Sequence, residues 1–323
     1  MTERPVWFSR AEVEALLDPL ALLERLRSAF LDVAAGTVSD PRPLRIDAPE
    51  HAANYVGFPC YWPAAGLACV KVLSGAERNP ERGLPIIDAV LVVMDAPTGR
   101  ILAIMDAAAI TAARTAAVTA LAVAALGPAP GGRVGLIGTG VQMEAHARFL
   151  ALQGGVDEFI VASAGEDLPR AKAAALRVAE ASGRPARAGS RRDAAGADVV
   201  VLTSVSTAPL FVAEATAPHA IVASVGPFLP HATELDERLV WSASRLVSDR
   251  RDRFLDQWRT AADRLGPAYG RVEDLPALLA GPATPSTGVR VFLSDGRAIE
   301  DLAAAALVLE AARERGVPGL ALP

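Results

Sequence analysis

The spacing of apolar residues predicts helices at both ends of the chain. Between residues 10 and 36, apolar side chains recur every three or four positions, which is the period of an amphipathic helix. Ser9 and Glu12 have the spacing of a capping box at its start, and Pro19 is expected to break it into a short and a longer piece. Residues 299–315 predict a second amphipathic helix with its own cap, which returns to the first part of the fold.

The stretch 40–106 predicts β-structure, because its apolar runs are rich in Val, Leu and Ile. Two of these runs, 89–95 and 100–105, flank a short Pro/Gly turn, which is typical of an antiparallel hairpin. After the hairpin the pattern changes to a helical period dominated by alanine. The uncharged run 115–132 is too short and too rich in alanine for a membrane span of about 20 residues, so we expect a buried helix that ends at Gly127.

A different pattern follows the Pro/Gly segment 127–132, where short apolar runs alternate with helical periods. Such alternation indicates a doubly wound parallel sheet, so the predicted fold class is α/β with a Rossmann-type domain. The expected strands are 133–137, 159–163, 197–204, 220–225 and 246–248, and the expected helices are 141–152 and 168–181.

Composition narrows the functional classes. The chain has 323 residues, of which 51% are hydrophobic, and this excludes a disordered protein. Its net charge of −5 gives no sign of the basic surface that a nucleic-acid binder needs. The charged N-terminus lacks the apolar segment of a signal peptide, so we expect a cytoplasmic protein that is not bound to a membrane.

The residues that bind metals or form disulfides are few. Cys60 and Cys69 are the two cysteines, which makes a disulfide framework improbable, and both are expected to fill the core. Four scattered histidines and the lack of a metal-binding motif predict that no metal is bound. The arginines within 250–253 are expected on a solvated helix face.

The turn Gly138-Thr139-Gly140 follows an expected strand and opens an expected helix. In a dinucleotide-binding turn, the first glycine permits the tight bend and the second lets a pyrophosphate approach backbone N–H groups at the helix N-terminus. The third glycine of the usual pattern is Met143 here, which leaves the closeness of helix and sheet open. The turn therefore predicts bound NAD or NADP, with an ordinary strand–helix turn as the alternative.

The choice between NAD and NADP depends on the end of the next strand. In NAD-binding domains an acid at this place holds the ribose 2′-hydroxyl. Here the place reads Ser163-Ala164-Gly165, with Glu166 and Arg170 near but off position. Because nothing at this position repels a 2′-phosphate, we slightly favour NADP.

Three cations are candidates for binding an anion. Lys71 lies within an apolar strand, where a buried ammonium needs an anionic partner; the alternative is the solvent face of an edge strand. Arg114 lies near the start of the alanine helix, where the helix dipole disfavours a cation, so it predicts a nearby ligand anion or an acid such as Asp106. Arg45 is informative only together with the other two.

Several motifs, in their order along the chain, resemble the ornithine cyclodeaminase/μ-crystallin family from about residue 40 to residue 315. The two most specific are Arg114-Thr115-Ala116-Ala117 and Gly138-Thr139-Gly140-Val141-Gln142. The others are Lys71-Val72, Asn79 with Gly83-Leu84-Pro85, Asp95 with Thr98-Gly99, Val225-Gly226 with Pro230, Glu234-Leu235-Asp236 and Ala298-Ile299-Glu300-Asp301.

The resemblance implies a homodimer. Each subunit would combine a Rossmann dinucleotide-binding domain with an α+β domain that contains antiparallel strands and serves substrate binding and dimerisation. The expected boundaries are 1–118 with 297–323 for the substrate domain and 119–296 for the Rossmann domain.

The resemblance also assigns site residues. The Arg, Lys and Arg that clamp a substrate α-carboxylate in this family fall on Arg45, Lys71 and Arg114, with Arg42 as the rival for Arg45. We expect the cofactor to contact Thr115, Gly138, Thr139, Gly140, Val141, Gln142, Ser163, Thr203 and Gly226.

Two departures from the family pattern bear on the reaction. The aspartate that works on the substrate amine in cyclodeaminases is replaced by Phe228, and the glutamate that serves the distal amine of ornithine is replaced by Val56. Neither side chain can take a proton or pair with an ammonium, so ring closure of ornithine is not expected. The ketimine reductases of the family do without that aspartate, because they start from an imine already formed.

We therefore predict an NAD(P)H-dependent reductase of 2-imino carboxylates, such as the cyclic imine pyrroline-2-carboxylate, or the reverse amino-acid dehydrogenase. Lys71, or a water that it orients, is the expected proton partner, and Phe228 would form an apolar wall against the substrate. The alternatives are an ornithine or lysine cyclodeaminase with tightly bound NAD, and a non-enzymatic protein that binds a small molecule.

Overall fold

The computed structural model describes residues 4–76, 78–127, 131–226, 228–229, 232–257, 268–282 and 286–322. The chain forms two compact units, and helix α3 (Ala107–Ala125) contains the boundary between them. Unit 1 comprises Met1–Arg114 and Arg297–Pro323, and unit 2 comprises Thr115–Gly296.

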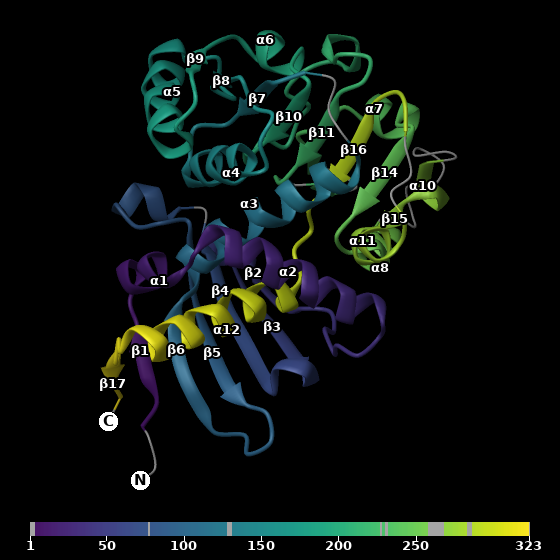
Figure 1. Ribbon diagram of the computed structural model, residues 1–323. Helices are drawn as coiled ribbons and strands as arrows, with labels where there is room; N and C mark the ends of the chain where they lie inside the picture. Colours follow the sequence, from purple (N-terminus) through teal and green to yellow (C-terminus); the bar gives the residue numbers. More distant parts are fainter. Residues whose placement is uncertain are drawn as a thin grey trace. The chain divides into compact units, whose positions relative to one another are not determined.

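Unit 1 is built on a mixed seven-stranded sheet (Figure 1). Its strands follow the order β17-β1-β6-β5-β4-β3-β2, and all neighbours are antiparallel except the parallel pair β1 and β6. The strands are β1 (Val6–Phe8), β2 (Leu44–Ala48), β3 (Ala53–Trp62), β4 (Leu67–Ala76), β5 (Ile87–Asp95), β6 (Ile101–Asp106) and β17 (Leu320–Ala321). The predicted hairpin is confirmed as β5 and β6.

Unit 1 also contains three helices: α1 (Arg10–Leu16), α2 (Pro19–Ala34) and α12 (Ala298–Arg315). Helices α1 and α12 pack against the sheet, and α2 packs against α12. Ser9 and Glu12 form the predicted capping box of α1, and Asp18 caps α2 so that the chain breaks before Pro19, as expected. Helix α12 packs beside α2 and contacts β3, β4 and β5 (Figure 1). The last part of the chain therefore covers the central strands.

The opposite face of this sheet is apolar and open. Side chains alternate between the two faces of a strand, so Val72 points away from the face to which its neighbour Lys71 points. The strand register places four more large apolar side chains on the face of Val72, and all five are exposed by more than two fifths: Leu44, Ile46, Tyr55, Tyr61 and Val72. Such a patch is typical of an interaction surface.

Unit 2 is built on an eight-stranded sheet in which every pair of neighbours is parallel, with the order β15-β14-β16-β11-β10-β7-β8-β9. The predicted doubly wound α/β class is confirmed. The sheet strands are β7 (Arg133–Ile137), β8 (Glu158–Ala162), β9 (Ala186–Ala188), β10 (Val199–Leu202), β11 (Ile221–Ser224), β14 (Arg245–Ser248), β15 (Glu273–Asp274) and β16 (Arg290–Leu293), and a separate hairpin joins β12 (Phe228–Leu229) to β13 (Ala232–Thr233).

Helices connect the strands of unit 2, as expected from the alternating pattern. They are α4 (Val141–Leu152), α5 (Leu168–Ser182), α6 (Arg191–Ala195), α7 (Glu237–Ser242), α8 (Arg251–Gln257), α10 (Ala268–Arg271) and α11 (Leu275–Ala280). The expectation of a solvated basic face at 250–253 is wrong for Arg250, because this residue precedes α8 and is only 1% exposed.

Helix α6 lies very close to β7. A Cβ atom placed on Gly135, in the middle of β7, would lie 1.9 Å from the carbonyl oxygen of Ala194. This distance is far below van der Waals contact, so only glycine fits at this position.

Helix α3 is long and apolar enough to span a membrane by length and composition, and about two thirds of its most apolar segment is buried inside the protein. That burial is what the core helix of a globular domain shows, in agreement with the predicted buried helix. The helix begins at Ala107, eight residues before unit 2 starts at Thr115.

Candidate active site

Lys71 lies in the middle of β4, on the sheet face that the helices of unit 1 cover. Its side chain is only 2% exposed, so the alternative position on a solvent face is wrong. The ammonium lies 2.6 Å from Oδ2 of Asp301 and 4.6 Å from the centre of the Phe58 ring, which is its cross-strand neighbour. A charge buried this deeply requires such partners.

Arg114 joins the same group from α3. Its Nε donates to Oδ1 of Asp301 at 3.1 Å, and its Nη1 donates to Oε2 of Glu300 at 2.6 Å. The expected acid is therefore present, but it is not Asp106, which instead accepts from the backbone N–H of Ala109. The expected unfavourable dipole is wrong, because α3 begins at Ala107 and the dipole acts mainly on the first turn.

Glu300 and Asp301 are site residues to which the sequence assigned no role. Both lie in the first turn of α12, and their exposed fractions are 0% and 1%. The expectation of a capped amphipathic helix is wrong at this end, since the N-cap residue Arg297 makes no side-chain cap and the first turns are buried on all sides. Two adjacent acids directly before the apolar run 302–309 were the available signal.

Burial lowers the pKa of the Lys71 ammonium. The positive charge of Arg114 lowers it further, while Asp301 and Glu300 favour the charged form and oppose the shift. A lysine in this setting releases its proton more readily than one in water, which suits it to proton transfer.

Arg45 has a different environment from the other two cations. It lies on β2, it is more than half exposed, and its guanidinium pairs with Asp47 at 2.8 Å. Its cross-strand neighbour is Val56, which is buried and in turn lies opposite Leu73 of β4. Arg45 therefore points to the same sheet face as Lys71, although its ion pair lies outside the buried group.

The glycine turn of unit 2 has the geometry that a dinucleotide needs. Gly138 has φ of +140°, and a Cβ placed there would lie 2.3 Å from Oγ1 of Thr203. Gly140 is the N-cap of α4, has no side-chain cap, and a Cβ placed on it would meet no atom within 4 Å. The space beside Gly140 and the uncapped N–H groups of α4 fit a pyrophosphate. Met143 takes the third position and is fully buried.

Two arginines of α5 reach this turn. Arg170 Nε donates to Oγ1 of Thr139 at 2.7 Å, and Arg177 Nη2 donates to the carbonyl oxygen of Thr139 at 2.9 Å. They bring positive charge to the place where the cofactor phosphates would lie. Of the other expected contacts, Val141 is largely exposed at the start of α4, and the carbonyl oxygen of Gln142 accepts from Nδ1 of His146 at 2.6 Å.

The expected ribose end lies at a cavity of about 370 Å³ at the carboxyl ends of β8 and β9. Ser163 lines it, together with the carboxylates of Glu166, Asp167 and Asp193. Glu166 pairs with Arg191 at 2.5 Å. The charged residues that line the cavity are therefore all acidic, and Arg191 reaches only Glu166. The expectation that nothing here repels a 2′-phosphate is wrong, and the slight preference for NADP stays an untested prediction.

A buried carboxylate joins two loops at the edge of unit 2's sheet where further cofactor contacts were expected. Glu234 accepts from the backbone N–H and the hydroxyl of Ser204, from the hydroxyl of Ser224 and from the N–H of Gly226. It thereby joins the loops that follow β10 and β11, where Thr203 and Gly226 were expected to meet the cofactor. Burial raises the pKa of Glu234. The sequence placed this residue only within a family motif.

The two remaining predicted site residues, Thr115 and Phe228, lie in α3 and β12. Thr115 is buried in α3, and its carbonyl oxygen accepts from the hydroxyl of Thr119. Phe228 lies in the short strand β12, and its side chain is outside the described structure.

Cys60 and Cys69 are buried free cysteines that face each other across β3 and β4. Within the described ranges, no group of three or more His, Cys, Asp or Glu could hold a metal ion.

Comparison with known proteins decides the family. The pattern of the "Ornithine cyclodeaminase/mu-crystallin family" matches residues 4–316. The chain belongs to this family. Among relatives of this ornithine cyclodeaminase/mu-crystallin family protein, a Δ1-pyrroline-2-carboxylate/Δ1-piperideine-2-carboxylate reductase of Azospirillum brasilense is 36% identical over 243 residues, which are 75% of this chain and 76% of the relative. The ketimine reductase mu-crystallin of Mus musculus is 29% identical over 318 residues, which are 96% of this chain and 98% of the relative.

A solved structure gives the same result for the fold of this family member. The Δ1-pyrroline-2-carboxylate reductase of Thermococcus litoralis, in complex with NADH and L-proline, matches with a TM-score of 0.90 and 26% identity, covering 97% of this chain and 98% of that one. The predicted family, the nicotinamide cofactor and the class of oxidoreductase acting on carbon–nitrogen bonds are confirmed by these relatives.

Proposed function

We propose that this protein reduces 2-imino carboxylates with NAD(P)H, that cyclic ketimines such as pyrroline-2-carboxylate are its first substrate class, and that it also runs the reverse dehydrogenation of the amino acid. The observation that carries the proposal is the buried pair of cations, Lys71 and Arg114, held by two acids on one face of unit 1's sheet. The relatives that reduce pyrroline-2-carboxylate and other ketimines support it.

In this proposal the chain's own residues bind, orient and protonate the substrate. Lys71 and Arg114 hold the α-carboxylate, with Arg45 moving from Asp47 to join them, and a fixed carboxylate orients the adjacent C=N bond. The nicotinamide, when bound, supplies the hydride for the imine carbon. Lys71, or a water that it orients, supplies the proton for the imine nitrogen, and Phe228 forms an apolar wall.

The buried position of Val56 supports reduction over ring closure. Val56 lies opposite Arg45 on the same sheet face as Lys71, and its side chain offers no carboxylate to a distal amine. A cyclodeaminase would release ammonia from ornithine or lysine without net consumption of cofactor, so the two reactions are easily separated. A non-enzymatic binding protein would bind cofactor and turn over none of these substrates.

The test is an assay of absorbance at 340 nm with the purified chain, NADH or NADPH, and either pyrroline-2-carboxylate or piperideine-2-carboxylate. We expect the absorbance to fall in proportion to the amount of imine that is added. It should stay constant when the imine is replaced by the corresponding saturated amino acid and the reduced cofactor is kept. A flat trace with both imines and both cofactors, across a panel of acyclic ketimines as well, would contradict the proposal. Ammonia release from ornithine would favour the cyclodeaminase.

We also propose that the protein is cytoplasmic.

We further propose that the protein forms a homodimer through the open apolar face of unit 1's sheet, because a second copy would cover the five exposed side chains on this face. We expect light scattering to give twice the chain mass of 33.5 kDa. Val72→Asp, in the centre of the face, should shift the protein to the monomer mass. Leu176→Asp, on the exposed surface of α5, should leave the dimer intact. A wild-type monomer at micromolar concentration would refute this proposal.

A further inference from the structure

The strand order of unit 2 separates the two halves of a dinucleotide site. Its run β9-β8-β7-β10-β11-β16 is the strand order of a Rossmann domain, and the glycine turn follows the central strand β7 (Figure 1). In such a domain the adenosine ribose lies at the end of the next strand along the chain, which is β8 here. The nicotinamide half is therefore expected on the other side of β7, at the carboxyl ends of β10 and β11.

Glu234 connects the two loops on this nicotinamide side. Its Oε2 accepts from the backbone N–H of Ser204 at 3.2 Å and from the hydroxyl of Ser204 at 2.6 Å. Its Oε1 accepts from the backbone N–H of Gly226 at 2.8 Å and from the hydroxyl of Ser224 at 3.1 Å. Ser204 follows β10, Ser224 ends β11, and Gly226 lies two residues further on. One carboxylate therefore binds the backbone of both loops.

The carboxylate is fully buried, and the chain is tightly packed around it. Glu234 is 0% exposed, and among the described residues its charge is stabilised by hydrogen bonds and by no lysine or arginine. A buried charge of this kind is costly unless its hydrogen bonds are kept. A Cβ placed on Gly226 would lie 2.3 Å from the carbonyl oxygen of Ser204 and 2.5 Å from Cδ of Glu234, so only glycine fits there.

The hydrogen-bond donors around Glu234 require an ionised carboxylate. A backbone N–H can only donate, and one such group points at each of the two carboxylate oxygens. A glutamine has the same shape, but its NH₂ group would face the N–H of either Ser204 or Gly226. Glu234→Gln therefore loses one of the two backbone bonds while the volume of the side chain is unchanged.

We propose that Glu234 is a positioning residue for the nicotinamide half of the cofactor: it holds the loops after β10 and β11 in place, whereas the adenosine half binds without its help. Thr203 and Gly226, two of the expected cofactor contacts, lie in these loops. None of the four bonds described for Glu234 goes to β8 or to the loop after it. The inference rests on the nicotinamide cofactor of the proposed function and not on its imine substrate.

The test measures two affinities by calorimetric titration of the full chain. The ligands are NADH and ADP, which is the adenosine half with both phosphates; if the wild type binds only NADPH, they are NADPH and the 2′-phosphate of ADP. We expect Glu234→Gln to bind the whole cofactor roughly tenfold more weakly or worse, and the adenosine half within about twofold of wild type, because a buried donor without an acceptor carries a penalty of this size. Circular dichroism checks that the variant is folded.

The matched control is Glu214→Gln in the same unit. The side chain of Glu214 is 67% exposed and pairs with Arg238 at 2.6 Å. The same chemical change at this exposed ion pair should leave both affinities within about twofold of wild type.

Ser204→Ala is a second and milder variant. It removes the hydroxyl bond to Oε2 of Glu234 and keeps both the carboxylate and its backbone bonds. It should weaken binding of the whole cofactor in the same direction as Glu234→Gln, by a smaller factor, and leave the affinity for the adenosine half unchanged.

The outcomes separate this inference from the proposed function. Equal losses of affinity for the whole cofactor and for its adenosine half in Glu234→Gln would overturn the inference, and so would unchanged affinities in the folded variant. If Glu234→Gln does not fold, Ser204→Ala decides by the same two measurements. A wild type that binds the cofactor but reduces no imine would contradict the proposed function alone, and binding of no cofactor would overturn both.

Discussion

Replacing Lys71 by methionine is expected to lower kcat/KM for imine reduction by about 10³-fold or more. Methionine fits an apolar strand and has a similar length, but it cannot bind a carboxylate or give a proton, and proton transfer alone contributes roughly 10²–10⁴-fold in enzymes. The measurement is the initial rate at 340 nm as a function of imine concentration.

The pH dependence of the same variant gives a second readout. In the reductive direction Lys71 acts in its protonated form, so the wild-type rate should fall as the pH rises through the lowered pKa of this residue. Lys71→Met should lack this alkaline decline. The loss should appear mainly in kcat if proton transfer dominates and mainly in KM if carboxylate binding dominates.

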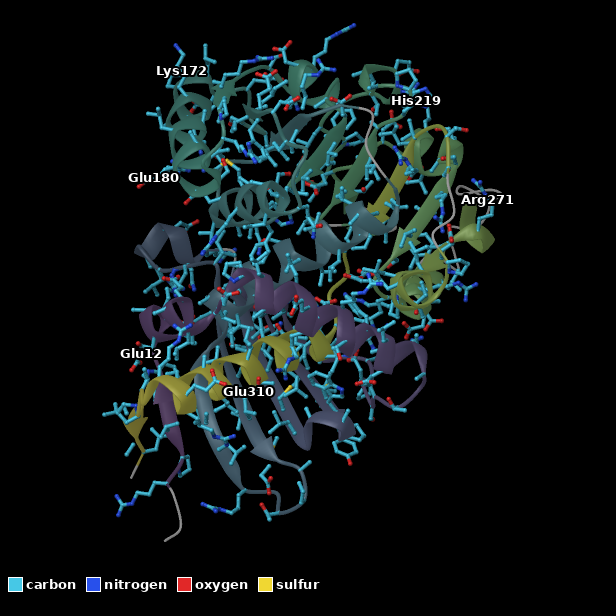
Figure 2. The ribbon with its side chains drawn as sticks, in the orientation of Figure 1. Glu12, Lys172, Glu180, His219, Arg271 and Glu310 are labelled. Atoms are coloured by element: carbon cyan, nitrogen blue, oxygen red, sulfur yellow. The ribbon has the colours of Figure 1, made fainter. Side chains whose placement is uncertain are left out.

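The chain offers a well-matched control, because Lys172 is its one other lysine. It lies on the exposed surface of α5 (Figure 2). Lys172→Met should keep kcat/KM within about twofold of wild type. Full activity in Lys71→Met would remove Lys71 from the proposed mechanism, whatever the substrate.

Replacing Gly135 by alanine is expected to lower the free energy of unfolding by at least about 3 kcal/mol. The added Cβ would lie 1.9 Å from the carbonyl oxygen of Ala194 and 2.6 Å from its carbonyl carbon, and both are backbone atoms. These two atoms can move away only if α6 moves away from β7, and this movement would loosen the packing between the helix and the sheet.

This stability difference is measured by urea unfolding of the wild type and the variant side by side. Gly165→Ala is the control, because a Cβ there meets no atom within 4 Å and the residue has an ordinary φ. It should change the free energy of unfolding by less than about 1 kcal/mol. A Gly135→Ala protein as stable as the control would show that α6 adjusts without cost.

Local features of the fold were predictable from the sequence because neighbouring residues determine them. The capping box at Ser9, the break before Pro19 and the glycine turn at 138–140 each involve residues within a few positions of one another. The same holds for the hairpin of β5 and β6, whose short turn fixes the pairing.

The charge partners of the site were not predictable in this way. Lys71 and Arg114 were recognised as cations that need anions, but the acids lie almost two hundred residues or more away along the chain, on α12. Two adjacent acids before an apolar run mark Glu300 and Asp301 as unusual, but acids are favoured at any helix start, so the pattern does not say which cations they meet. For the same reason the role of Glu234, which joins two distant loops, was missed.

Gly135 shows a similar limit. A glycine within a run of apolar residues predicts a close approach of some backbone, but the sequence does not say which one. The approach is made by α6, almost sixty residues further on.

The placement of α12 has a consequence for synthesis on the ribosome. Unit 2 is continuous in sequence, whereas the first 114 residues receive the counter-charges of Lys71 and Arg114 only from α12, which is made after unit 2. A nascent chain that has already emerged up to unit 2 therefore still carries two cations that cannot be buried without a large penalty. Unit 1 can therefore bury these charges only after all of unit 2 and α12 have been made.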